Sequence, residues 1–118
     1  MQTTEQLLYQ LKNSDDPDAA LMLQMLEMGS DFSRPHQPEF CFESPAREKL
    51  ETLAAVLGAM NFELELYTPD DDHPDFQLIA RKEMLLELSD MQEWTKKFES
   101  LSTQYGVNYD GWGAEINA

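Results

Sequence analysis

The sequence has little that would support disulfide bonding, membrane insertion or phosphate binding. Its 118 residues include one cysteine, Cys41, so no intramolecular disulfide can form. The five glycines have neither the dinucleotide-binding nor the P-loop spacing. No stretch approaches the ~20 apolar residues that a membrane span needs, and the first residues lack the basic and apolar regions of a secretion signal. We therefore expect a cytoplasmic protein in a reducing compartment.

Positive charge is scarce as well. Eight Lys and Arg stand against 23 Asp and Glu, which gives a formal net charge of −15. Neutralising phosphates requires clustered basic side chains, and the densest groups here are the pairs at 81–82 and 96–97. We therefore expect no direct binding to nucleic acid or to an anionic membrane, and we expect a basic protein as partner. The alternative is that the acidity only keeps a small protein soluble.

No group of residues has the spacing of an active site. His36 and His73 fall in predicted loops, where we expect both side chains to be solvated. Cys41 stands between two phenylalanines and two glutamates, surroundings that favour a structural thiol over a nucleophile. The acidic run 70–75 lacks the Gly and Glu positions of an EF-hand loop. We expect a protein without catalysis, cofactor or bound metal.

The first 30 residues predict two short helices. The first begins at a cap formed by Thr3 or Thr4. Asp16 suits the N-cap of the second helix, Pro17 its first position, and Gly29 its C-terminal end. The second helix is apolar over much of its circumference, so either the body of the domain or another copy of the protein must cover it.

The rest of the chain alternates between strand and helix patterns. A helix follows the first predicted strand, and another follows the third, beginning at a capping box formed by Ser89 and Gln92. The order βαββαβ predicts an α+β fold, a ferredoxin-like sandwich with an antiparallel sheet and both helices on one face. We expect one domain, 1–118, with a helical segment at 1–30 and a ferredoxin-like core at 39–113. The predicted strands cover residues 39–43, 62–67, 76–84 and 107–113.

The end of the chain carries its most distinctive motif, Tyr-Asp-Gly-Trp-Gly at 109–113. A large aromatic residue between two glycines near a terminus indicates a docked and shaped tail. The simpler interpretation is an edge strand with a bulge or turn, in which Trp112 serves packing. Together with Gly-Ser-Asp at 29–31, the motif resembles the RraB family, regulators of ribonuclease E activity. The resemblance implies an α+β fold and an inhibitor that binds ribonuclease E outside its catalytic chemistry.

We therefore hypothesise a protein-binding regulator of RNA degradation whose acidic surface engages a basic, RNA-binding segment of a ribonuclease. Tyr109 and Trp112 are the predicted aromatic anchors of this contact, and Asp110 orients the turn between them. An acidic adaptor or immunity-type protein, dimerising through its N-terminal helices and binding another basic protein, is the alternative. A small-molecule sensor has less support, since the sequence identifies no polar pocket. The predicted acidic contacts are Glu63, Glu65, Asp70, Asp71 and Asp72.

Overall fold

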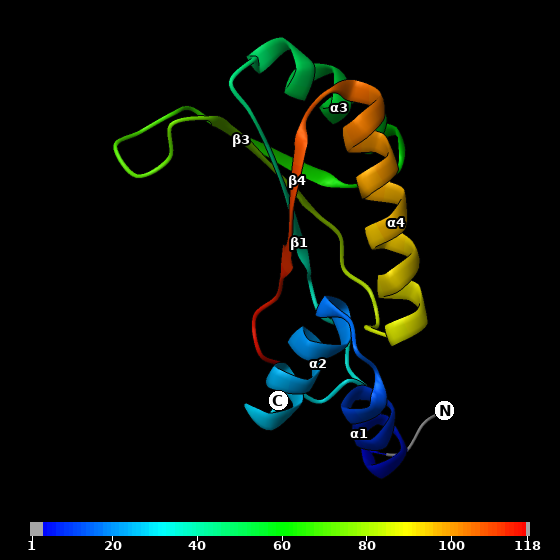
Figure 1. Cartoon of the computed structure of the whole chain (residues 1–118). Helices are drawn as coiled ribbons and strands as arrows, with labels where there is room; N and C mark the ends of the chain where they lie inside the picture. The colour runs from blue at the N-terminus through cyan, green and yellow to red at the C-terminus, as the bar shows by residue number, and fades with distance from the viewer. Residues whose placement is uncertain (1–3, 118) are drawn as a thin grey trace.

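The computed structural model describes residues 4–117, which form four helices and a four-stranded antiparallel sheet (Figure 1). This confirms the predicted α+β class, with helices preceding the sheet. The elements, in chain order, are α1 (Thr4–Asn13), α2 (Pro17–Glu27), β1 (Glu39–Ser44), α3 (Arg47–Ala59), β2 (Glu63–Tyr67), β3 (Phe76–Arg81), α4 (Leu88–Tyr105) and β4 (Asn108–Gly113).

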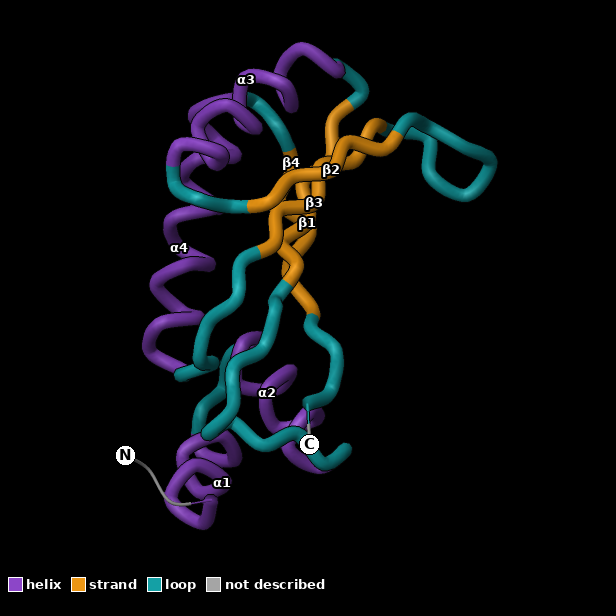
Figure 2. Tube along the Cα trace, turned by 180° about the vertical axis from the view of Figure 1, so that it is seen from behind, coloured by secondary structure: helices purple, strands orange, loops and turns teal. Residues whose placement is uncertain are grey.

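The strands lie in the order β2-β3-β1-β4, and each neighbouring pair is antiparallel. Helices α3 and α4 both lie on one face of this sheet, and the described part of the chain places no helix on the other face (Figure 2). Helices α1 and α2 lie beyond one end of the sheet, where α2 packs on α4. The loop between β2 and β3 projects away from the opposite end of the sheet (Figures 1 and 2).

The core lies between the sheet and its two covering helices. Phe40 and Phe42 alternate with polar residues on β1 and are fully buried, as their period-2 spacing predicts. Their rings lie 4.7 and 5.4 Å from that of Phe98 on α4, and Trp94 stacks on Phe98 at 5.4 Å. Burying a phenylalanine side chain contributes about 1.5–3 kcal/mol, so this aromatic cluster is a major source of stability. Leu50, Leu53 and Leu57 of α3 complete the layer.

Several predicted helix boundaries are confirmed by their geometry. Asp16 caps α2, accepting a hydrogen bond from the backbone N–H of Ala19 at 2.9 Å. Gly106 ends α4 in the left-handed conformation at φ 69°, which glycine adopts without strain. The cap predicted at Thr3 or Thr4 lies outside the side chains that the structure describes.

The capping box predicted at Ser89 and Gln92 is wrong. Helix α4 begins at Leu88, with Glu87 in the N-cap position and no side-chain cap hydrogen bond. The Gln92 amide instead donates to Asp16 Oδ2 at 2.6 Å, a partner 76 residues away in sequence. A charged acceptor from another helix is a stronger partner than a neutral backbone group, so the tertiary contact prevails over the local motif.

The expectation that His36 is solvated is also wrong. His36 is 3% exposed, and its backbone pairs with Met84, so the predicted third strand ends at Arg81 and continues only as this isolated bridge. Its Nδ1 donates to the carbonyl oxygen of Arg34 at 3.0 Å, since a carbonyl can only accept. Its Nε2 lies 3.1 Å from Ser30 Oγ. His73, in contrast, is exposed in the β2–β3 loop as predicted.

Candidate protein-interaction surface

The sheet face that none of the described helices covers is acidic, and we call it the open face. Side chains alternate along a strand, so the residues between the buried ones point to this side. Five of its residues are acidic, and Arg81 is its one basic residue among those that the structure describes. The open face consists of Glu39, Cys41, Glu43, Glu63, Glu65, Tyr67, Gln77, Ile79, Arg81, Asn108, Asp110, Gly111 and Gly113.

Arg81 neutralises part of this charge. Its guanidinium pairs with Glu65 on β2 and, through Nε at 3.5 Å, with Glu39 on β1. The hydrogen bond to Glu65 raises the pKa of Arg81, and hydrogen bonds from Tyr67 and Arg81 lower the pKa of Glu65. No salt bridge in the described chain involves Glu43, Glu63 or Asp110, so no basic side chain neutralises these three carboxylates there.

A bulge in β4 decides where the residues of the terminal motif point. Tyr109 pairs with Phe42 and Gly111 with Cys41, so Asp110 is an extra residue without its own partner on β1. Residues 109 and 112 would face opposite sides of a regular strand, but the insertion turns both toward the covered side. Gly111, at φ 96°, adopts the left-handed backbone that the bulge requires. An edge strand with a bulge, the simpler interpretation of the motif, is therefore what the structure has.

Trp112 joins the sheet to the N-terminal helices. Its indole Nε1 donates to Asp18 Oδ1 on α2 at 2.8 Å, and Thr95 Oγ1 on α4 donates to the same oxygen at 2.9 Å. Asp18 is 7% exposed, so these two donors satisfy a buried carboxylate. Tyr109 packs on Phe42 with ring centres 5.1 Å apart, and burial raises the pKa of its hydroxyl.

Cys41, Glu43 and Asp110 form a cluster on the open face, where one ligand atom from each lies within 4.8 Å of the others. Burial, together with the smaller effects of the negative charges of Asp110, Glu43 and Glu39, raises the pKa of the Cys41 thiol to about 11. The thiol is therefore protonated at neutral pH, and a protonated thiol is a poor nucleophile. Cys41 is half-buried, as predicted, and its structural role stays a prediction.

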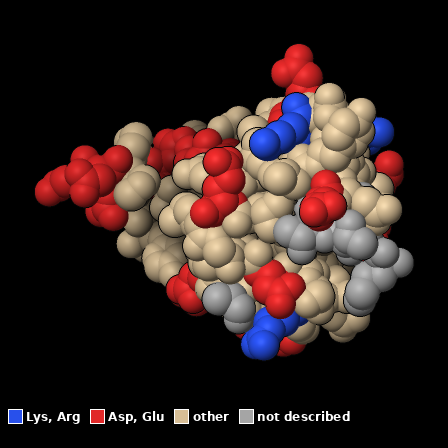
Figure 3. All heavy atoms as spheres, turned by 90° about the horizontal axis from the view of Figure 1, so that it is seen from below, with Lys and Arg blue, Asp and Glu red and all other residues tan. Residues whose placement is uncertain are grey.

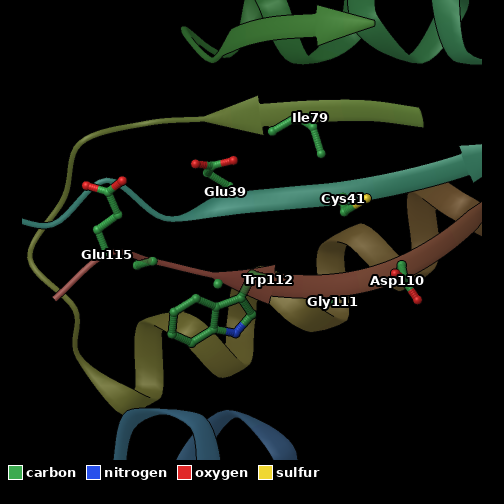
Figure 4. Close-up of a pocket in the computed structure, with 9 residues that line it drawn as sticks. Glu39, Cys41, Ile79, Asp110, Gly111, Trp112 and Glu115 are labelled. Carbon is green, nitrogen blue, oxygen red and sulfur yellow. The ribbon is translucent and has the colours of Figure 1, made fainter. Parts of the chain in front are cut away.

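Beside the cluster lies a shallow hollow of about 400 Å³ (Figure 4). Cys41 and Ile79 contribute to its floor, and the carboxylates of Glu39, Asp110 and Glu115 lie around it. The indole of Trp112 extends toward α2, and only part of this residue borders the hollow. The remaining lining residues are Gly111, Gly113 and Ala114.

The β2–β3 loop presents a second acidic group at the end of the open face. Figure 3 shows Asp and Glu along the side of the molecule from which this loop projects, with the visible Lys and Arg farther from it. Asp70 holds the loop together: its Oδ1 accepts from the backbone N–H groups of Asp72 and His73 at 2.9 and 2.7 Å. These bonds lower the pKa of Asp70. Asp71 and Asp72 are exposed.

The structure brings some of the predicted site residues together and separates others. Glu63, Glu65 and Asp110 share the open face, and the three loop aspartates extend beyond its end. Tyr109 and Trp112 lie on the covered side, so their predicted role as anchors stays a prediction while their packing role is visible.

Sequence reasoning missed Glu39, Glu43 and Arg81 as residues of this surface. The alternation of β1 contained the signal for the two glutamates, because Phe40 and Phe42 on one face place their neighbours on the other. Arg81 needed the strand register, which pairs it with both Glu39 and Glu63.

The fold and this surface define a small acidic protein whose exposed carboxylates and uncovered sheet suit contact with another macromolecule. None of the described helices is long and apolar enough to cross a membrane. The chain belongs to the RraB family, regulator of ribonuclease activity B, whose family model matches residues 15–114. This confirms the resemblance noted in the sequence. A comparison with curated proteins finds no significant match.

Proposed function

We propose that this protein regulates a ribonuclease by binding one of its basic, RNA-binding segments with the open face, and that it performs no catalysis. Membership in a family of ribonuclease regulators supports a ribonuclease as the partner, and we propose that this ribonuclease is ribonuclease E. The observation that carries the proposal is the open face itself, which has five carboxylates and one arginine and which no described helix covers.

The charge of this face acts mainly on encounter and selectivity. At physiological salt the screening length is ~8 Å, so exposed carboxylates attract a basic segment only at short range. Electrostatic attraction of this kind raises the rate of association with a basic segment, and the same negative charge repels polyanions such as RNA. The protein would then occupy the site on the enzyme that RNA otherwise occupies. A slowly dissociating complex also requires contacts within the interface from which water is excluded.

We also propose how the chain is organised. We assign residues 39–113 to the ferredoxin-like arrangement; the strand order β4-β1-β3-β2 and the placement of α3 and α4 on one face support it. We treat residues 1–118 as one domain, since a single hydrophobic cluster extends from Leu7 of α1 to Phe98 of α4. A cytoplasmic location is part of the proposal, because that is where a regulator of RNA degradation meets its enzyme.

The test is the rate of association with ribonuclease E, measured by stopped flow over a range of salt concentrations. The double variant Glu43→Gln/Asp110→Asn removes two unpaired carboxylates of the open face with little change of shape. We expect it to bind several-fold more slowly at low salt, with a flatter salt dependence. The control, Glu48→Gln/Glu99→Gln, removes the same charge from the exposed side of the helix layer and should bind like the natural protein. Equal slowing by both variants would assign the effect to net charge and refute the open face as the site.

The loop is tested separately. Asp71→Asn/Asp72→Asn neutralises its two outer carboxylates and leaves Asp70, which holds the turn, in place. We expect slower association with unchanged thermal stability. An unchanged on-rate would remove the loop from the binding site.

One observation favours a second candidate, the acidic adaptor that dimerises through its N-terminal helices. Tyr9 on α1 is 73% exposed and Met28, which follows α2, is 63% exposed, so apolar surface is available at this end of the molecule. Light scattering after size-exclusion chromatography distinguishes the candidates. A dimer that Tyr9→Ser converts to a monomer would favour the adaptor, and a monomer at all concentrations would exclude it.

A further inference from the structure

The hollow on the open face combines an apolar floor with carboxylates at its border. It exists because β4 has two residues without side chains on this face: a Cβ built on Gly111 or Gly113 would meet no atom within 4 Å. Ala114 extends the same bare strip. Cys41 and Ile79, which pair across β1 and β3, form an apolar floor beside it.

Carboxylates border this apolar floor at both ends. Glu39 and Glu115 lie at one end, and Asp110 lies at the other (Figure 4). Glu43 adds its charge next to Asp110, since both lie within 4.8 Å of the Cys41 sulfur and of each other. Two carboxylates this close repel each other unless a cation lies between them. In the described chain no salt bridge reaches Asp110, Glu43 or Glu115.

We propose that this hollow accepts an arginine side chain from the basic segment of the partner, with its aliphatic part on Cys41 and Ile79 and its guanidinium between Asp110 and Glu43. The inference rests on the proposed function and identifies the contact that gives it specificity. Arginine fits better than lysine because its planar, weakly hydrated guanidinium presents five donors and bonds two carboxylates at once. The flat guanidinium and the aliphatic stem of arginine can also pack on the apolar floor. The ammonium group of lysine is strongly hydrated, so lysine would gain less binding free energy from this contact.

A metal ion is a poorer occupant of the same cluster. Its potential ligands, one thiol and two carboxylates, fall short of the tetrahedral ligand set of a structural Zn²⁺ site and of the roughly six to eight oxygen ligands that Ca²⁺ takes.

The experiment fills the hollow without touching its charges. Gly113 has no positive φ and its Cβ would enter open space, so Gly113→Leu places a side chain in the hollow without backbone strain. Gly113→Ala fills it only in part and serves as a graded variant if the larger side chain perturbs the fold. The probes are hexa-arginine and hexa-lysine peptides, titrated at low salt into isotope-labelled protein and followed by the amide signals of Gly111, Gly113 and Cys41.

We expect hexa-arginine to shift these signals and to bind more tightly than hexa-lysine. Gly113→Leu should weaken hexa-arginine binding on the order of tenfold, the effect of losing a charge-assisted hydrogen-bonded contact, and should bring the two peptides close to equal affinity. Gly113→Ala should give an intermediate loss with the same trend.

Two results would overturn the inference. Equal binding of the two peptides to the natural protein would exclude a selective arginine receptor. Unchanged hexa-arginine binding by Gly113→Leu, together with weaker binding by Glu43→Gln/Asp110→Asn, would refute the hollow and leave the open face as a general acidic surface. Failure of the proposed function is distinct from both, since it shows as absent or charge-independent binding of ribonuclease E.

Discussion

Asp18 is the residue whose replacement tests the architecture most directly, because its carboxylate joins three elements. One oxygen accepts hydrogen bonds from Trp112 Nε1 on β4 at 2.8 Å and Thr95 Oγ1 on α4 at 2.9 Å. Asp18→Ala removes both bonds and leaves two donors without their acceptor. We expect α2 to lose its fixed position against the sheet and the free energy of unfolding to fall.

The size of the loss follows from these contacts. A hydrogen bond to a charged acceptor contributes about 1.5–3 kcal/mol, and Asp18 also lies in the first turn of α2, where a negative charge adds ~0.3–1 kcal/mol. Trp112 and Thr95 are only half-buried, so water replaces part of what the donors lose, and we expect a net loss of about 2–3 kcal/mol. For 118 residues the unfolding entropy is roughly 0.25 kcal/mol per kelvin, so Tm should fall by about 8–12 °C.

Thermal unfolding followed by circular dichroism and by tryptophan fluorescence measures this loss. Asp18→Asn keeps an oxygen acceptor without the charge and should lose roughly half as much. The control is Asp15→Ala, which replaces an exposed aspartate in the connection just before α2. A Tm of Asp18→Ala within about 2 °C of the control would refute the reasoning, because two charged hydrogen bonds cannot vanish at so small a cost.

Three further predictions concern other parts of the fold. Burial raises the pKa of the Cys41 thiol from its usual 9.0 to about 11, so folding favours the neutral thiol; this contribution to stability is complete below pH 9 and is lost as pH rises toward 11. Denaturant unfolding should therefore show a steeper loss of stability between pH 9 and 11 in the natural protein than in Cys41→Ala, and identical profiles would contradict this. Deleting Asp110 removes the bulge but leaves Tyr109 and Trp112 two residues apart, so both should stay on the covered side and the tryptophan fluorescence should change little; a red-shifted spectrum would show that the bulge itself is needed to orient Trp112. Gly106→Ala forces a side chain into a left-handed cap and should cost about 1 kcal/mol in urea unfolding, whereas no change would mean that the cap relaxes freely.

Local patterns were enough to predict most elements of this fold. The alternation of Phe40 and Phe42 on β1 and the helical spacing of Trp94 and Phe98 on α4 each reflect a single period, which depends only on the geometry of one element. The boundaries at Asp16 and Gly106 were equally readable, because capping is a contact within a few residues. Such features need no knowledge of distant parts of the chain.

The errors all arose where a distant partner competed with a local one. Gln92 bonds to Asp16 and not to the start of its own helix. His36 is buried because the segment around Met84 and the serine at position 30 both reach it. Neither contact can be predicted from the neighbouring sequence, because each joins segments that only the completed fold brings together.

The candidate site shows the same division. Charge and alternation alone indicate an acidic surface on β2, with Glu63 and Glu65 on one side of the strand. The register of four strands was needed to add Glu39 and Glu43 and to show that Arg81 neutralises part of the charge. The family motif at the end of the chain was visible, but the orientation of its residues was not.

By itself, the amino-acid sequence determined the class of fold, the acidity and the family, because periodicity, composition and short motifs are properties of the chain alone. The tertiary structure decided which side of the sheet stays uncovered and which side chains it presents. The single inserted residue, Asp110, exchanges the faces to which all later residues of β4 point. Trp112 therefore points to Asp18, while Gly111 and Gly113 leave a hollow among carboxylates. The orientation of these residues depends on the pairing of β4 with β1, which lies roughly 70 residues earlier in the chain. Pairing between strands so far apart in sequence is set by the packing of the whole domain.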